Sequence, residues 1–282
     1  MSVTPLRGNL RKMQVELAET VQYTLKLMNN NEECSISMNN FIGKPIHLHY
    51  TGVINCVACG RKTNKSFQQG YCFPCMRALP ECDSCILKPE TCHYAEGSCR
   101  DEAWGEKHCM QPHYVYLANS SGMKVGITRG TQIPTRWIDQ GASQALPIFE
   151  VATRLQSGLL EVILKQHISD RTDWRKMLKG VAEQVDMVAR RDELLALCAD
   201  EIDDLASRFP GDIKAIDHAD VLNINFPVNT YPTKVSSFNF DKTPDVKGTL
   251  QGIKGQYLIL DSGVINLRKF GGYQIELSQE AS

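Results

Sequence analysis

Alternating apolar and polar positions near both ends of the chain predict β-strands. In two runs every second residue is apolar: Val21, Tyr23, Leu25 and Leu27, then Ile46, Leu48 and Tyr50. A period of two is typical of strands with one buried face. From about residue 226, short apolar runs are punctuated by glycines. We expect an N-terminal β segment at 1–54 and a C-terminal one at 210–282, which would pair into one small barrel without exposed edges.

The middle of the chain combines strand-like and helix-like patterns. Three apolar runs predict strands: HYVYLA at 113–118, MKVGIT at 123–128 and PIFEVATR at 147–154. Pro134 can open a short helix after the second run. Ser157 can cap another, which carries Leu160, Glu161 and Leu164 at helical spacing. A long acidic helix is expected over 180–208, before Pro210. Residues 112–209 therefore read as one α/β domain.

The segment 55–111 contains too few apolar residues to form a core without a metal. Nine of the eleven cysteines lie there, and the other two, Cys34 and Cys198, are expected to be buried thiols. No apolar signal segment or run of about 20 apolar residues occurs, which predicts a cytoplasmic protein with no membrane association. Clustered thiols in a reducing compartment are metal ligands more often than disulfides.

Two Cys-x2-Cys turns stand in the first half of this segment. They are Cys56 with Cys59 and Cys72 with Cys75, separated by twelve residues. Each such turn directs two thiolates at one ion, and two turns complete a tetrahedral shell. The spacing predicts a zinc ribbon with a closed, structural metal site.

The second half carries five thiols, one more than a tetrahedral shell needs: Cys82, Cys85, Cys92, Cys99 and Cys109. Zinc held by four of them, including the Cys82–Cys85 pair, would give a chain with two structural zinc ions instead of one. An iron–sulfur cluster, which also takes four thiolates, is the alternative. The spacing does not choose between these two metals.

Charge is balanced overall but uneven along the chain. The formal net charge is −1, which does not predict a nucleic-acid partner by itself. From Lys44 to Arg77, however, there are five basic residues and no acidic ones. Acidic residues are frequent between Glu81 and Glu106, which disfavours phosphate contact there. No motif for a small-molecule cofactor is present.

The order of four residues in the middle domain resembles the GIY-YIG nuclease superfamily. Tyr116 lies on the first strand, Gly126 follows Lys124 and Val125 on the second, Arg136 lies on the next helix, and Glu161 on a later one. The resemblance implies that Tyr116 and Lys124 orient or activate water, that Arg136 stabilises the transition-state phosphate, and that Glu161 binds Mg²⁺ or Mn²⁺. It also implies that the glycine allows close backbone approach to phosphate.

Two positions depart from that superfamily's pattern. Tyr114 replaces the first glycine of the first motif, and Lys124 replaces the tyrosine of the second. Lys124 could bind phosphate or act as a base, but the lost tyrosine is equally compatible with lost catalysis. The ribbon, the KVGIT strand, the RW-x-DQGA stretch and the T-x-W stretch together also resemble a bacterial family of uncharacterised zinc-containing proteins, which implies no activity.

These patterns predict an α+β protein. Its parts would be a zinc ribbon, a second Cys-rich metal site, a three-stranded GIY-YIG-like centre and a small barrel formed by the terminal segments. The leading hypothesis is a divalent-metal-dependent endonuclease acting on DNA or RNA. One alternative is a non-catalytic DNA- or RNA-binding module with a degenerate nuclease site. The other is an iron–sulfur or redox protein.

Overall fold

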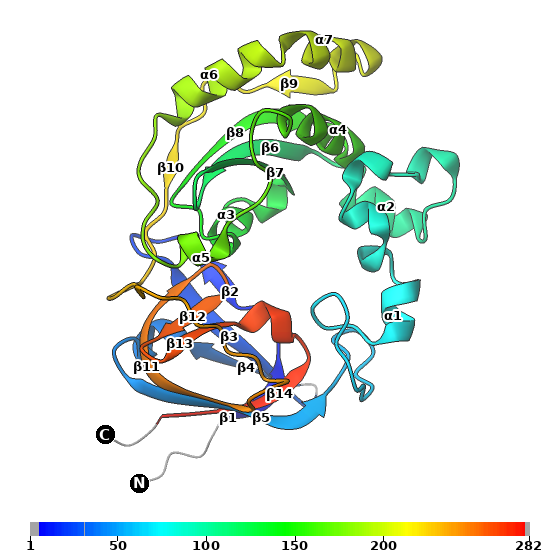
Figure 1. The fold of residues 1–282 in the computed structure, drawn as a ribbon. Helices are drawn as coiled ribbons and strands as arrows, with labels where there is room; N and C mark the ends of the chain where they lie inside the picture. Colours follow the sequence, from blue (N-terminus) through cyan, green and yellow to red (C-terminus); the bar gives the residue numbers. More distant parts are fainter. Residues whose placement is uncertain (1–5, 31, 280–282) are drawn as a thin grey trace. The chain divides into compact units, whose positions relative to one another are not determined.

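The computed structural model describes residues 6–30 and 32–279, and the chain divides into two compact units (Figure 1). The first unit takes the residues up to Arg77, Leu178–Gly180 and the residues from Asn225 onward. The second takes Ala78–Met177 and Val181–Ile224. Each unit is therefore assembled from segments that are distant in sequence.

A single curled sheet forms most of the first unit. Its nine strands among the described residues follow the order β13-β12-β11-β5-β14-β1-β3-β2, with β4 also paired to β3. Their bounds are β1 (Leu6–Leu10), β2 (Gln14–Glu16), β3 (Gln22–Asn29), β4 (Glu32–Ser37), β5 (Pro45–Ile54), β11 (Asp245–Lys254), β12 (Tyr257–Leu260), β13 (Gly263–Asn266) and β14 (Tyr273–Gln279). The helix α1 (Phe73–Ala78) follows the Cys-rich turns.

The two ends of the chain pair with each other, as the alternating patterns predicted. Strand β5 lies between β11 and β14, so Leu48 stands opposite Val246 on one side and Leu277 on the other. All three side chains are buried. Along the described path, β13 and β2 are not paired with one another, so the sheet is an open half-barrel (Figure 1). The expectation of a closed barrel was wrong in this respect.

The second unit is built on an antiparallel sheet with the order β10-β8-β6-β7, and β9 pairs with β8. Its strands are β6 (His113–Asn119), β7 (Met123–Arg129), β8 (Gln144–Val151), β9 (Ile213–Ala215) and β10 (Leu222–Asn223). Strand β6 lies at the centre, between β7 and β8. The three strands expected from the apolar runs are therefore present and adjacent.

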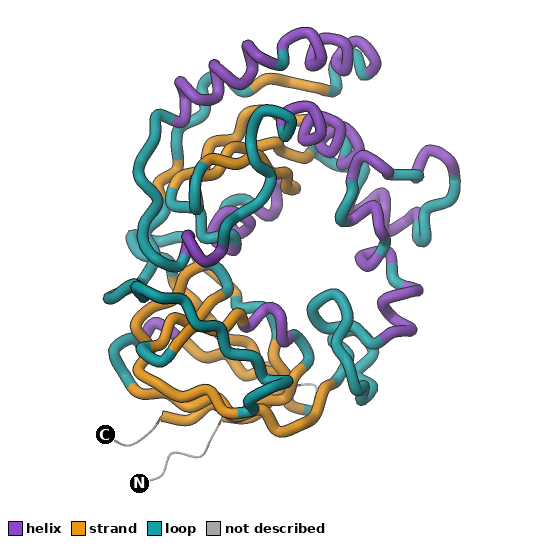
Figure 2. The backbone as a smooth tube through the Cα atoms, viewed as in Figure 1, coloured by secondary structure: helices purple, strands orange, loops and turns teal. Residues whose placement is uncertain are grey.

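Helices and short turns complete the second unit (Figure 2). The α-helices are α2 (Glu102–His108), α3 (Thr135–Asp139), α4 (Arg154–Leu164), α5 (Trp174–Met177), α6 (Met187–Leu197) and α7 (Ala199–Arg208). Val115 and Leu117 of β6 share a hydrophobic core with Leu160 and Leu164 of α4. Tyr116 points to the opposite face, where its ring meets Trp137 of α3 edge-on at a centroid separation of 5.8 Å. Helices therefore stand on both faces of β6.

Helix α4 begins earlier than its sequence suggested. Thr153 is its N-cap and forms a reciprocal capping box with Gln156. Ser157 lies inside the helix, where its hydroxyl donates to the Arg154 carbonyl at 2.7 Å. The expected cap at Ser157 was wrong because the Thr-x-x-Gln pair satisfies the free N–H groups one turn earlier.

The acidic region 180–208 forms two helices instead of one. Asp186 caps α6 by accepting from the backbone N–H groups of Val188 and Ala189. Residues before α6 stay extended because side chains of the sheet bind their backbone. Asn119 donates to the Glu183 carbonyl, and Gln144 donates to the Val185 carbonyl. Within the described chain, no helix has the length and apolar character needed to cross a bilayer.

Candidate functional site

Four thiols of the first unit form a tight group at the end of β5. The sulfur atoms of Cys56, Cys59, Cys72 and Cys75 all lie within 4.8 Å of one another. Cys59 Sγ and Cys72 Sγ are 3.8 Å apart. A tetrahedron of thiolates with Zn–S bonds of 2.3 Å has edges of about 3.8 Å. The group can therefore hold one metal ion such as zinc.

Tight turns with two glycines bring these four thiols together. Gly60, just after the first Cys-x2-Cys pair, has φ +72°, and its N–H donates to the Cys56 carbonyl at 2.9 Å. Gly70 has φ +147°, and a Cβ there would lie 2.5 Å from a Val57 methyl carbon. Only glycine fits both positions without strain. The turns are thus encoded locally, beside the cysteines themselves.

The protonation of these thiols also favours a cation. Burial opposes ionisation of Cys56, but backbone N–H groups of Cys59, Cys72 and Ala58 overcome it and lower its pKa to about 6. Hydrogen bonding to Cys59 and Cys72 raises the pKa of Cys75 to about 12. Four thiolates this close repel one another, so full ionisation requires a bound cation.

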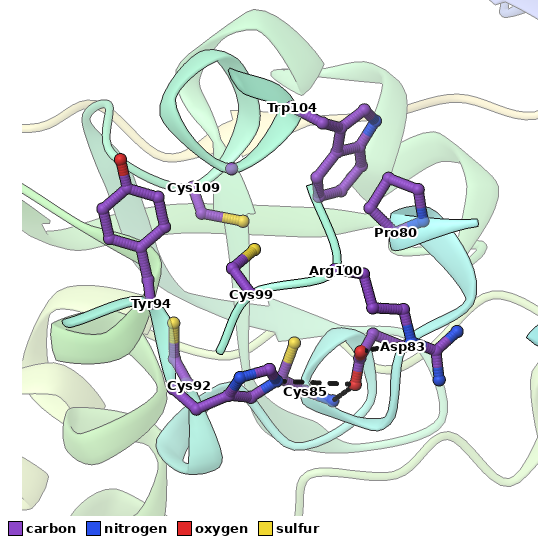
Figure 3. Close-up of a pocket in the computed structure, with 11 residues that line it drawn as sticks. Pro80, Asp83, Cys85, Cys92, Tyr94, Cys99, Arg100, Trp104 and Cys109 are labelled. Carbon is purple, nitrogen blue, oxygen red and sulfur yellow. Dashed lines mark hydrogen bonds and ion pairs between the residues drawn. The ribbon is translucent and has the colours of Figure 1, made fainter. Parts of the chain in front are cut away.

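A second set of thiols lines a pocket in the second unit (Figure 3). Cys85, Cys92, Cys99 and Cys109 come from four separate turns, and their sulfur atoms are directed into the space between those turns. Burial, Asp83 and the neighbouring thiols raise the pKa of Cys85 to about 11. Burial also raises the pKa of Cys109. A cation would be needed to hold these groups as thiolates.

Cys82 does not line that pocket, although its side chain is buried. The expected Cys82–Cys85 pair is therefore not the pair that the fold brings to the pocket. Asp83 stands between them and accepts hydrogen bonds from the Cys85 N–H and the Ser84 hydroxyl. Its carboxylate also forms an ion pair with Arg100 at 2.6 Å. Asp83 and its ion pair with Arg100 therefore fix the turn that carries Cys85.

The middle domain gathers the motif residues around Tyr116. Tyr116 stands opposite Gly126 across the β6–β7 pair, and a Cβ on Gly126 would lie 2.7 Å from the tyrosine hydroxyl. The glycine therefore makes room for the Tyr116 ring. The Tyr116 hydroxyl donates to Gln140 Oε1 at 3.2 Å. Burial raises its pKa, while Arg136 and Gln140 oppose that rise.

Lys124, Arg136 and Glu161 lie close enough to one another to affect their ionisation. Burial, with a contribution from Arg136, lowers the pKa of Lys124 to about 8, and Glu161 opposes the shift. Burial and Asp170 raise the pKa of Glu161, while Lys165 and Arg136 lower it. Arg136 also lowers the pKa of Tyr116, and Glu161 raises it. Four residues separated by up to 45 positions therefore form one electrostatic group.

Two further members of this group were not singled out from the sequence. Gln140 follows Arg136 by one helical turn, so its place in the RW-x-DQGA stretch was the available signal. Asp170 acts on both Lys124 and Glu161, and it follows Ser169, which forms a parallel bridge with Lys124. Tyr114, two residues before Tyr116 on β6, instead donates to Glu150 at 2.8 Å.

A third potential metal-binding group lies on the sheet of the first unit. His47 Nε2 and His49 Nδ1 contact the same oxygen of Asp245, at 2.7 Å and 2.9 Å. Both histidines lie on one face of β5, and Asp245 stands opposite His49 on β11. The two histidines lower the pKa of Asp245. This arrangement also suits an ordinary cross-strand polar cluster.

Comparison with known proteins gives one match. No curated protein and no solved structure matches the chain. A family model described as protein of unknown function (DUF2797) matches residues 43–275, which include the ribbon, the second thiol set and the group around Tyr116. Because this match covers most of the 282 residues, the chain belongs to the DUF2797 family.

Proposed function

We propose that this protein acts on nucleic acid through a GIY-YIG-like centre, as a Mg²⁺- or Mn²⁺-dependent phosphodiesterase. The observation that supports this is the mutual electrostatic influence of Tyr116, Lys124, Arg136 and Glu161. They were expected together because their order resembles that superfamily. Tyr116 and Lys124 lie on the adjacent strands β6 and β7, and Arg136 and Glu161 lie on α3 and α4.

The chemistry of these groups suits phosphodiester cleavage. Glu161 offers a carboxylate to one divalent cation, which would polarise the phosphate oxygens. Arg136 offers a guanidinium that stabilises the negative charge developing on the phosphate. Lys124 is buried and has a pKa of about 8, so it can accept a proton near neutral pH. Tyr116 is held by Gln140 and would orient the attacking water.

The remaining parts fit a substrate of DNA or RNA. An open hollow beside β7 is lined by Arg171, Lys176, Ser121 and Ser169, which can contact a phosphate backbone. The ribbon carries basic residues and no acidic ones, so one structural zinc ion there would leave a surface suited to phosphate. A cytoplasmic location would keep all of these thiols reduced.

Cleavage assays with matched variants test the proposal. The protein would be incubated with single- and double-stranded DNA and RNA in Mg²⁺ or Mn²⁺, beside Glu161→Gln and Arg136→Met. Each variant should lower the cleavage rate about 100-fold or more. Glu193→Gln is the control because Glu193 is an exposed residue on α6 that pairs with Arg190. Equal cleavage by the protein and Glu161→Gln would overturn the assignment.

The pH dependence of cleavage tests the role of Lys124. A lysine acts as a base only when neutral, so the rate should rise as pH rises through about 8. Lys124→Arg, which stays charged, should remove that rise while leaving substrate binding at low salt nearly unchanged. A profile that is the same in both proteins would exclude Lys124 as the base.

A second candidate function is a non-catalytic nucleic-acid-binding module. The complete burial of Tyr116 favours it, because its ring fills the space over Gly126. The replacements at Tyr114 and Lys124 favour it too. Binding that weakens steeply with salt, without cleavage in either metal, would support this candidate over the enzyme. Absence of binding at low salt would exclude both.

A further inference from the structure

We propose that Cys85, Cys92, Cys99 and Cys109 bind one [4Fe–4S] cluster. These four thiols line one pocket, and their sulfur atoms point into it from four separate turns (Figure 3). Four converging cysteine thiolates are the ligand set of such a cluster.

The separation of the thiols distinguishes this site from the ribbon. The four ribbon sulfurs lie within 4.8 Å of one another, as a single zinc ion requires. Among the described residues, the second set of four thiols does not form a group of that tightness, whereas Cys85 Sγ does so with one oxygen of Asp83 and one ring nitrogen of His93. A cluster accounts for the wider arrangement, because iron and sulfide atoms stand between its thiolates and keep them apart.

The spacing along the chain favours four irons over two. Cys85, Cys92, Cys99 and Cys109 contribute one thiol per turn, with no Cys-x2-Cys pair among them. Where one metal takes two thiolates, those sulfurs approach to about 3.8 Å, as the paired turns of the ribbon allow. A [2Fe–2S] cluster places two thiolates on each iron, whereas a [4Fe–4S] cluster takes one thiolate per iron.

A buried guanidinium supplies charge and a hydrogen-bond donor to this pocket. Arg154 lies beside one of the proposed ligands, because its backbone N–H donates to the Cys109 carbonyl at 2.9 Å. Its Nη2 donates to the Ile86 carbonyl at 2.7 Å, one residue after Cys85. Its Nε is buried and has no hydrogen-bond partner among the described residues. Four thiolates make a cluster anionic, and hydrogen bonds to its sulfurs stabilise it.

Two aromatic residues also line the same pocket. Tyr94 and Trp104 lie beside the thiols, together with the polar side chains of Asp83, His93 and Arg100 (Figure 3). Gly105 allows the Tyr94 ring and Cys99 to lie close, because a Cβ there would be 2.9 Å from the ring and 3.3 Å from Cys99 Sγ. Groups around a metal centre control its exposure to solvent and its stability.

The local structure depends on a cross-link of this kind. Residues 80–96 form four 3-10 helices of three residues each, with few buried apolar side chains. The turn at Pro89 and Glu90 packs against Gly158 of α4, the helix that carries Glu161. Cluster binding would therefore hold the helix that positions Glu161, a consequence that rests on the proposed function.

Metal analysis of the full chain tests the proposal. The protein would be produced in iron-replete cells and purified without oxygen, then assayed for iron, acid-labile sulfide, zinc and visible absorption. About four iron and four sulfide per chain are expected, with about one zinc from the ribbon. Reduction with dithionite should bleach the brown colour and give an electron paramagnetic resonance signal.

Single-cysteine variants assign the ligands. Cys85→Ala and Cys99→Ala should lose most of the iron and keep the zinc. Cys59→Ala should lose the zinc and keep most of the iron. Cys82→Ala is the matched control, because Cys82 lies in the same segment but outside the pocket. Cys99→Ser supplies a weaker oxygen ligand, so an altered spectrum in a folded chain is expected even if the alanine variants fail to fold.

Several results would overturn the proposal. A colourless protein with two zinc ions and no iron would show that the second site is zinc. Two irons per chain would contradict the [4Fe–4S] assignment, and full iron retention in Cys99→Ala would contradict the ligand set. The nuclease proposal is tested separately. An intact cluster without cleavage would contradict only the nuclease proposal, whereas cleavage by a protein with two zinc ions would contradict only the cluster proposal.

Discussion

The two cysteine sets of this protein use the same ligand atom but differ in how the chain presents it. In the ribbon, two Cys-x2-Cys turns with Gly60 and Gly70 beside them bring four sulfurs within 4.8 Å of one another. In the second set, four turns give one thiol each, and the sulfurs converge without reaching that tightness. Short-range turns suit a single ion, while dispersed thiols in a wider pocket suit a larger inorganic group.

The largest effect should follow loss of a ribbon thiol. Cys72→Ala removes a ligand that is 2 % exposed, and structural zinc contributes on the order of 10 kcal/mol to folding in small metal domains. We expect one zinc fewer per chain and rapid proteolysis within 55–77, with the iron of the second site unchanged. Cys34→Ala is the control, since Cys34 lies on β4. Unchanged zinc in Cys72→Ala would contradict the ribbon.

Arg154→Met should destabilise the second site without touching the ribbon. The variant removes the hydrogen bond to the Ile86 carbonyl and the positive charge near Cys85 and Cys109. Hydrogen bonds from charged groups contribute about 2–3 kcal/mol, so thermal unfolding should shift by several degrees and iron should be lost faster. Arg190→Met, at an exposed ion pair on α6, should change little. Equal shifts of the unfolding temperature in both variants would contradict a specific role of Arg154 at the second site.

Gly105→Ala should have a smaller effect on the same site. Alanine favours a helix over glycine by roughly 1 kcal/mol, but crowding against Tyr94 and Cys99 costs about 1–3 kcal/mol. A net destabilisation of about 1 kcal/mol is expected. Denaturant unfolding with iron analysis measures it. Gly180→Ala is the control, because a Cβ there meets nothing within 4 Å, and a stabilised Gly105→Ala would argue against close packing on Cys99.

The smallest effect should come from acid acting on Asp83. Burial opposes its ionisation, but the Cys85 N–H, Ser84 and Arg100 lower its pKa below the usual value of 3.8. A carboxyl group with a lowered folded pKa stabilises the fold above its unfolded pKa and loses that contribution as pH falls through the folded value. Between pH 7 and 5, Asp83→Asn should therefore leave the pH slope of stability unchanged. Below about pH 4 the variant should show a shallower loss than the native chain.

Local features of the sequence were enough for much of the fold and for one site. Strands β3 and β5 follow from residue alternation, because a pleated strand places every second side chain on its buried face, while β6, β7 and β8 follow from short apolar runs. The ribbon follows from spacing, because a Cys-x2-Cys turn is closed within a few residues. The site around Tyr116 was predicted from the order of its residues, which resembles that of the GIY-YIG superfamily, and it stays a prediction.

The long-range features needed the tertiary structure. The late start of α6 at Met187 depends on Asn119 and Gln144 of the sheet, which bind the backbone of Glu183 and Val185. The role of Gly126 depends on the Tyr116 ring across the strand pair. Neither is visible in local composition.

The five thiols from Cys82 to Cys109 show most clearly which features the sequence determined and which only the fold decided. The sequence predicted that the segment 55–111 needs metal, because its apolar residues are too few to form a core. Only the fold decided that Cys85, Cys92, Cys99 and Cys109 share a pocket while Cys82 lies outside it. Single thiols on separate turns carry no register of their own, so their meeting point is set by packing against α4 and by Arg154.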